Sequence, residues 1–173
     1  MKKLIALAVL VVAGVAFASS LSVPWFVDQP DTNVGCPPTD AATTVGLVYL
    51  HNNQTGTITC QIAYFTQDGY PLGPDAPANT FTIPTASTMA FRPVADDMYD
   101  ATHPFGQESS VSKLVPNRPK ISTIPGGAKS NGSLVVTWVG LSTDVQGIYV
   151  QSQNVSGVNG RIAHWGTLLP PGA

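Results

Sequence analysis

The fold of this chain is indicated most clearly by residues 57–65, which read Thr57-Ile58-Thr59-Cys60-Gln61-Ile62-Ala63-Tyr64-Phe65. Every second side chain from Ile58 to Tyr64 is apolar or a thiol, and the side chains between them are Thr, Gln or Ala. This period of two is the pattern of a β-strand with one buried face, so Cys60 is expected to face the core. A turn signal, Asp68-Gly69, follows because glycine adopts the positive φ of a tight reversal.

Similar short segments recur along the rest of the chain. We expect further strands at 44–51, 79–83, 88–92, 133–139, 146–151 and 161–168. The segment 133–139 is the most apolar and is expected to be a central strand, with Trp138 in the core. The segment 21–27 is expected to be an edge strand, because Pro24 cannot donate a hydrogen bond to a neighbour.

Helices of useful length are not expected. No long window places apolar residues at helical spacing, and 15 prolines and 16 glycines interrupt the chain. Short strands separated by turns predict an all-β sandwich or barrel. We see no internal repeat and no low-complexity linker, so the strands are expected to form a single domain.

The N-terminus has the features of a secretory signal peptide. Lys2 and Lys3 precede an apolar run that ends at Ala18. The run is about fifteen residues long, too short for a permanent membrane span, which needs about twenty. We therefore expect residues 1–18 to be removed and 19–173 to form the domain, located outside the cell, at the cell surface or in the periplasm. A lipid anchor is not expected, because the first cysteine is Cys36.

The charge of the mature chain excludes one class of partner. Without Lys2 and Lys3, six basic residues face ten acidic ones, a formal charge of −4 that argues against nucleic-acid binding. Charged residues make up only 10% of the sequence, so neutral polar side chains must cover the surface. Such a surface offers little repulsion between copies, which suits an extracellular assembly.

The two cysteines, Cys36 and Cys60, are expected to form a disulfide. A chain exported to an oxidising compartment usually pairs its thiols. Closing this loop would contribute about 3 kcal/mol in the chain-entropy model. The alternative is two free, buried thiols.

A long irregular segment, about 94–124, interrupts the succession of short strands, and a ligand site is expected in it. It holds a local concentration of carboxylates, Asp96, Asp97 and Asp100, with Glu108 nearby. Carboxylate oxygens are the ligands calcium requires, so these three aspartates are a candidate calcium site and calcium is the one cofactor considered. The alternative is a solvated turn in which the aspartates cap their own backbone.

Signatures of catalysis are missing from the sequence. There is no Gly-x-Ser-x-Gly, His-Glu-x-x-His or Cys-x-x-Cys motif, and His51, His103 and His164 lie far apart along the chain. We therefore expect a protein that is not an enzyme. A hydrolase whose residues meet only in space stays an alternative, and would need a polar pocket with paired carboxylates or a nucleophile beside a base.

A set of aromatic residues is a candidate sugar-binding set, because exposed rings in β-sandwich modules stack on sugars. The candidates are Trp25, Phe26, Tyr70, Tyr99 and Trp165. Burial in the core is the alternative for each of them. Among the basic residues, Arg92 between Phe91 and Pro93 is the one singled out, with an ion pair as its structural role.

A family resemblance rests on five short motifs: Val48-Tyr49-Leu50-His51-Asn52-Asn53, Asp68-Gly69, Thr80-Phe81-Thr82-Ile83-Pro84, Phe91-Arg92-Pro93 and Leu168-Leu169-Pro170-Pro171-Gly172. Together they resemble uncharacterised secreted bacterial proteins with an immunoglobulin-like sandwich, over most of the mature chain. The resemblance implies an all-β, single, immunoglobulin-like antiparallel β-sandwich. It implies no activity and assigns no functional residue.

These features together predict a secreted, non-catalytic structural or cell-surface assembly protein, such as a surface-layer, matrix or filament subunit. Its expected partners are further copies of itself or cell-surface glycans, and the alternative function is a carbohydrate-binding or adhesin module. The segment 21–27 is a candidate donor strand for a neighbouring copy. The alternative for that segment is a strand paired within its own domain.

Overall fold

The structure is a computed structural model, and it describes residues 18–27, 44–93, 115–154 and 162–168. These residues form nine β-strands and no helix. The strands are β1 (Ala18–Val27), β2 (Thr44–Asn52), β3 (Ile58–Phe65), β4 (Pro71–Gly73), β5 (Thr80–Ile83), β6 (Thr88–Phe91), β7 (Asn131–Val139), β8 (Val145–Asn154) and β9 (Ile162–Leu168).

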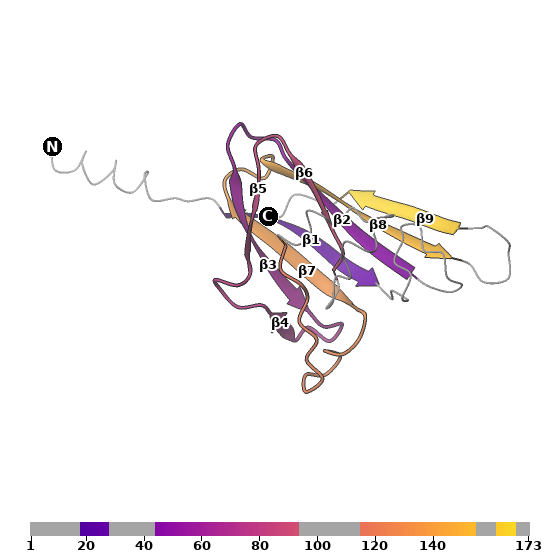
Figure 1. Cartoon of the computed structure of the whole chain (residues 1–173). Coiled ribbons are helices and arrows are strands. Elements are labelled where there is room, and N and C mark those ends of the chain that lie inside the picture. Colours follow the sequence, from indigo (N-terminus) through magenta and orange to yellow (C-terminus); the bar gives the residue numbers. More distant parts are fainter. Residues whose placement is uncertain (1–17, 28–43, 94–114, 155–161, 169–173) are drawn as a thin grey trace, which may run out of the picture.

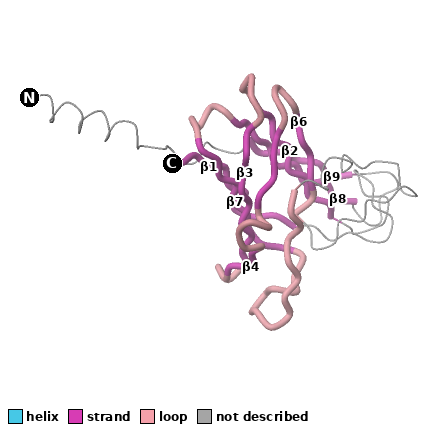
Figure 2. Tube along the Cα trace, turned by 60° about the vertical axis from the view of Figure 1, so that its left-hand side comes forward, coloured by secondary structure: helices cyan, strands magenta, loops and turns pink. Residues whose placement is uncertain are grey.

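The strands form two sheets in which every pair is antiparallel. Sheet A has the order β1-β7-β3-β4, with β5 also paired to β3, and sheet B has the order β6-β2-β8-β9. In Figure 1 the strands β3, β7 and β1 lie together, next to the layer of β2, β8 and β9. Figure 2 shows the same two groups of strands from a second direction. The arrangement is all-β and sandwich-like.

The strands expected from alternation are confirmed, each within a few residues of its expected ends. The strand β7 lies between β1 and β3, as its apolar sequence predicted, and β1 lies at the edge of sheet A. One strand was missed: β4 has only three residues, too few to show a period of two.

The core lies between the two sheets and is built from the alternating apolar side chains. Cys60, Ile62 and Tyr64 of β3 are buried, while Gln61 between them is exposed. The other sheet contributes buried side chains from β2, β6 and β8 to the same cluster: Val48, Leu50, Met89, Phe91, Val145 and Tyr149. Burying a large apolar side chain stabilises a fold by roughly 1.5–3 kcal/mol, so this shared cluster is what holds the sheets together.

The edge strand β1 is paired with β7 of its own domain over nearly its whole length. Ser19 donates from Oγ to the Gly140 carbonyl oxygen at 2.7 Å, and the Val27 amide donates to the Tyr149 hydroxyl of sheet B at 3.3 Å. The register shifts between Val23 and Phe26, where Pro24 cannot donate to the ladder. In the structure the segment 21–27 therefore closes its own domain.

Asn52, the last residue of β2, ties one end of the sandwich together. Its side chain is fully buried, and the two hydrogens of Nδ2 are shared among the carbonyl oxygens of Gly56 at 2.8 Å, Ile83 at 3.0 Å and Pro84 at 3.0 Å. Its Oδ1 accepts from the amide of Gln54 at 2.7 Å. One amide group thus satisfies backbone groups of two turns and the end of β5.

Candidate functional site

The carboxylates expected to bind calcium, Asp96, Asp97 and Asp100, lie outside the described residues. Within the part of the chain that the structure describes, no group of three or more His, Cys, Asp or Glu side chains could hold a metal ion. The calcium site therefore stays a prediction.

Cys60 is described as a free thiol and is completely buried between Phe81 and Trp138 on the neighbouring strands. Burial raises the pKa of this thiol to about 12. A thiol that stays protonated at neutral pH is a poor nucleophile. Its expected partner, Cys36, lies outside the described residues, so the disulfide stays a prediction.

Of the three histidines, only the His51 side chain is described, since His103 and the side chain of His164 lie outside the description. His51 Nδ1 lies 3.0 Å from the Thr88 hydroxyl on the neighbouring strand. This contact joins β2 to β6. The described residues also include no helix long and apolar enough to cross a membrane.

The outer face of sheet A carries a row of neutral hydrogen-bonding side chains. The register pairs Ser20 with Thr137, Thr137 with Gln61, and Gln61 with Thr80, so these four residues lie side by side across β1, β7, β3 and β5. Thr59 and Thr82 form a neighbouring pair in the next row. Hydroxyl and amide groups both donate and accept, so the face can bind neutral polar groups in either sense.

This face is also uncharged. None of the five strands of sheet A, as described, contains a Lys, Arg, His, Asp or Glu residue. Part of the opposite outer face, on sheet B, is covered, because Val45 and Leu47 of β2 are nearly fully buried there although both lie outside the core cluster.

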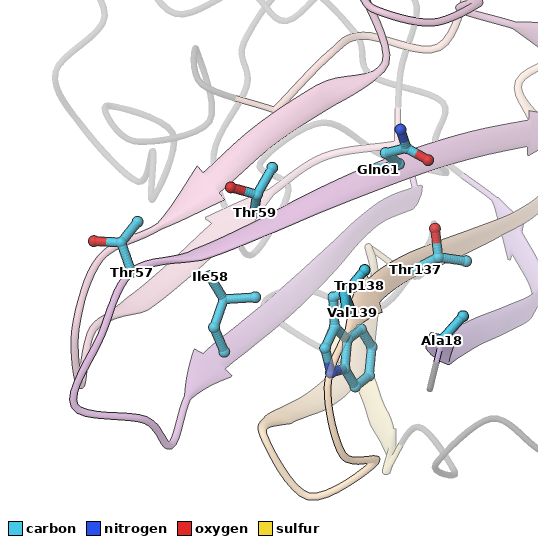
Figure 3. Close-up of a pocket in the computed structure, with 8 residues that line it drawn as sticks. All are labelled: Ala18, Thr57, Ile58, Thr59, Gln61, Thr137, Trp138 and Val139. Atoms are coloured by element: carbon cyan, nitrogen blue, oxygen red, sulfur yellow. The ribbon is translucent and has the colours of Figure 1, made fainter. Parts of the chain in front are cut away.

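A pocket of about 400 Å³ opens on sheet A where the ladder between β3 and β7 ends (Figure 3). Thr59, Gln61 and Thr137 point to the outer side of the sheet, whereas Ile58 and Trp138 point the other way. Ala18 and Val139 complete the rim on the side of β1. No residue that lines this pocket is an acid, a base or a strong nucleophile, so its chemistry is hydrogen bonding and apolar contact.

The aromatic residues named as sugar-binding candidates divide into two exposed and one buried. Trp25 is 50% exposed and Tyr70 is 47% exposed, whereas Phe26 is buried in the core. Both exposed rings lie at the end of sheet A where β1 and β3 finish, because these two strands run in the same direction on either side of β7. Tyr99 and the side chain of Trp165 lie outside the description.

Sequence reasoning missed the pocket and the row of hydroxyls. A signal was present in Thr57-Ile58-Thr59 and Thr80-Phe81-Thr82, where threonines repeat every second residue. Such a repeat predicts that the threonines of one strand share a face. It does not predict that Thr59 lies opposite Thr82, which depends on strand register.

Comparison with known proteins adds little to the site. No protein-family model matches the chain, and no curated protein matches it. Among solved structures, a protein of Thermotoga maritima, described as "Crystal Structure of Thermotoga maritima 1070", is similar at a TM-score of 0.42 and 8% sequence identity. The match covers 87% of this chain and 91% of that one. Similarity at this level says nothing about function.

Proposed function

We propose that this chain is a secreted, non-catalytic structural protein of the cell exterior, with an immunoglobulin-like sandwich that assembles with further copies of itself. A surface-layer, matrix or filament subunit fits this description. The signal peptide, the extracellular location and the immunoglobulin-like type are parts of the same proposal. It is supported by the secretory features of residues 1–18 and by the surface of sheet A.

The observation that carries the proposal is the absence of charge from sheet A, over the five strands described. Soluble monomers usually place charged side chains on exposed sheet edges and faces, because an uncharged edge pairs readily with another chain. An uncharged surface of this kind does little to keep copies of a protein apart, so it suits a subunit of an assembly better than a monomer.

The edge strand β1 is the part of this surface best suited to pairing. On one side it bonds to β7, and in the described residues its other side pairs with no strand. The regular stretch before the register shift at Val23 is long enough for an antiparallel pair with β1 of a second copy. Main-chain hydrogen bonds would give the affinity of such a pair, and the alternating side chains would give its register.

The test is sedimentation velocity and electron microscopy of the purified secreted protein over a wide range of concentration. We expect wild type to form oligomers, and Ser22→Lys on β1 to shift the population to monomer, because like charges would meet at the paired edge. Gln146→Lys on the exposed outer side of β8 is the matched control and should assemble as wild type does. A wild-type protein that stays monomeric at every concentration would refute the proposal.

A carbohydrate-binding or adhesin module is the second candidate. It is favoured by the two exposed rings, Trp25 and Tyr70, which lie at one end of sheet A. Binding of the protein to insoluble polysaccharides tests it, with Trp25→Ala and Tyr70→Ala as variants and Gln146→Ala as control. Loss of binding in the first two variants alone would support this function, and no binding by wild type would exclude it for the polysaccharides used.

A further inference from the structure

The most unusual side chain of the described structure is Arg118, in the irregular segment 115–130 that precedes β7. In Figure 1 this segment is the orange loop that leads into β7. The Arg118 side chain is only 2% exposed. Its Nη1 donates to the carbonyl oxygen of Gly127 at 3.4 Å, a long hydrogen bond.

The remaining guanidinium nitrogens have no partner. Nε and Nη2 are both buried, and neither forms a hydrogen bond. The carboxylates present in the described residues are Asp68, Asp75 and Asp144, and none of them is bonded to Arg118. Asp144 is engaged elsewhere, since its two oxygens accept from the Leu141 amide and from Gln54 Nε2.

A buried guanidinium without a partner is an unusual arrangement. Burial lowers the pKa of Arg118, while the neighbouring Tyr64 raises it, so the surroundings as a whole disfavour the charged form. Arginine nevertheless stays protonated in proteins, because its intrinsic pKa lies far above neutral pH. Removal of a charge from water is compensated only when an opposite charge and hydrogen-bond acceptors replace the lost water. A compensating anion is what this site lacks.

The geometry of the free nitrogens indicates which anion fits. Nε–H and Nη2–H lie along the same edge of the planar guanidinium, and that edge matches the two oxygens of a carboxylate. The third nitrogen, Nη1, is directed to the Gly127 carbonyl and holds the plane in place. We propose that Arg118 is the anchor of a ligand site that binds the carboxylate group of a small organic anion through two parallel hydrogen bonds.

The surroundings of Arg118 are compatible with entry of a ligand. Gly127 belongs to a loop with four short-range backbone hydrogen bonds: Ile121 N to Gly127 O at 3.3 Å, Ile124 N to Ile121 O at 3.2 Å, Gly127 N to Ile124 O at 2.8 Å and Lys129 N to Gly126 O at 3.1 Å. All four bonds join residues within the loop, and such a loop opens at lower free energy than the sheets do. On the inner side, the Tyr64 hydroxyl donates to the Pro116 carbonyl at 2.9 Å and fixes the start of the segment.

The experiment measures the melting temperature of the full secreted protein in increasing sodium acetate, against sodium chloride at equal ionic strength. We expect a saturable rise with acetate for wild type and no such rise for Arg118→Met. Arg118→Lys keeps the charge but lacks the two parallel N–H donors of the guanidinium, so this variant should bind acetate at least about tenfold more weakly. Lys120→Met removes an exposed cation two residues away and serves as the control, with the acetate response unchanged.

A second readout separates a ligand site from a structural role. Without added anion, Arg118→Met should unfold at a urea concentration equal to or above that of wild type, because it removes an unpaired buried charge. If instead a carboxylate elsewhere in the chain pairs with Arg118, the variant unfolds much earlier and acetate has no effect on wild type, which overturns the proposal. A rise with sodium phosphate equal to that with acetate would overturn the assignment to a carboxylate.

Discussion

The side chain of Asn52 makes the most specific prediction about stability. Replacement by alanine removes the two Nδ2 hydrogens, which three carbonyl oxygens share, and one accepted bond. The backbone groups that lose their partner belong to two segments: Gln54 and Gly56 in the turn after β2, and Ile83 and Pro84 at the end of β5. The expected result is the loosening of one end of the sandwich.

The loss of stability expected for Asn52→Ala depends on how deeply each hydrogen bond is buried. The bond to the Ile83 carbonyl is buried, and leaving such an acceptor unsatisfied costs roughly 1–3 kcal/mol. The other three bonds are partly buried, so water can replace them in part, and each contributes about 0.5–1.5 kcal/mol. Neighbouring bonds are not additive, and we expect Asn52→Ala to lower the free energy of unfolding by about 3–5 kcal/mol.

Urea denaturation followed by tryptophan fluorescence measures this change. The matched control is Asn53→Ala, the adjacent residue, whose exposed Nδ2 donates one bond to the Thr143 carbonyl at 2.8 Å. The control should lose less than about 1 kcal/mol, because water replaces an exposed bond. Equal destabilisation of the two variants would show that the buried amide does not hold the turns together.

Two further predictions concern Cys60 and the glycines. In the reduced protein, burial raises the pKa of Cys60 from 9.0 to about 12. As the pH rises through this window, the thiol of the unfolded chain loses its proton before the thiol of the folded protein does. The free energy of unfolding therefore falls, by at most about 1.4 kcal/mol per pH unit. The stability difference between wild type and Cys60→Ala should therefore shrink above about pH 9, and a constant difference would contradict the burial of the thiol. Gly132→Ala would place a methyl group against the Phe65 carbonyl oxygen and should cost about 1–3 kcal/mol or more. Gly56→Ala, with open space around it, should change stability by less than about 0.5 kcal/mol in the same melts.

The fold class was predictable from sequence because alternation is a local signal. Ile58, Cys60, Ile62 and Tyr64 are two residues apart, and the pleat of a strand places them on one face whatever the partner strand is. Pro24 likewise predicted an edge, since it lacks the donor that a central strand needs. The three-residue β4 could not be predicted from sequence, because it forms only through its pairing with β3.

The candidate sites were less predictable. The carboxylates predicted to bind calcium lie outside the residues that the structure describes. Among the basic residues, the sequence analysis singled out Arg92 and not Arg118. Nothing in Pro116-Asn117-Arg118-Pro119 indicates burial, because a short run between two prolines is typical of an exposed loop. Arg118 is buried in the tertiary structure, where it contacts Gly127, nine residues later.

The sequence by itself determined that this protein is built from short strands, that it carries the features of an export signal, and that the strands of sheet A are uncharged. These properties belong to single segments, so residue type and spacing are sufficient to specify them. Only the tertiary structure decided that Ser20, Thr137, Gln61 and Thr80 lie in one row and that Arg118 is buried without a partner. Both depend on strand register and loop packing between residues distant in the chain, and a shift of register by a single residue would turn each strand's hydroxyls toward the core.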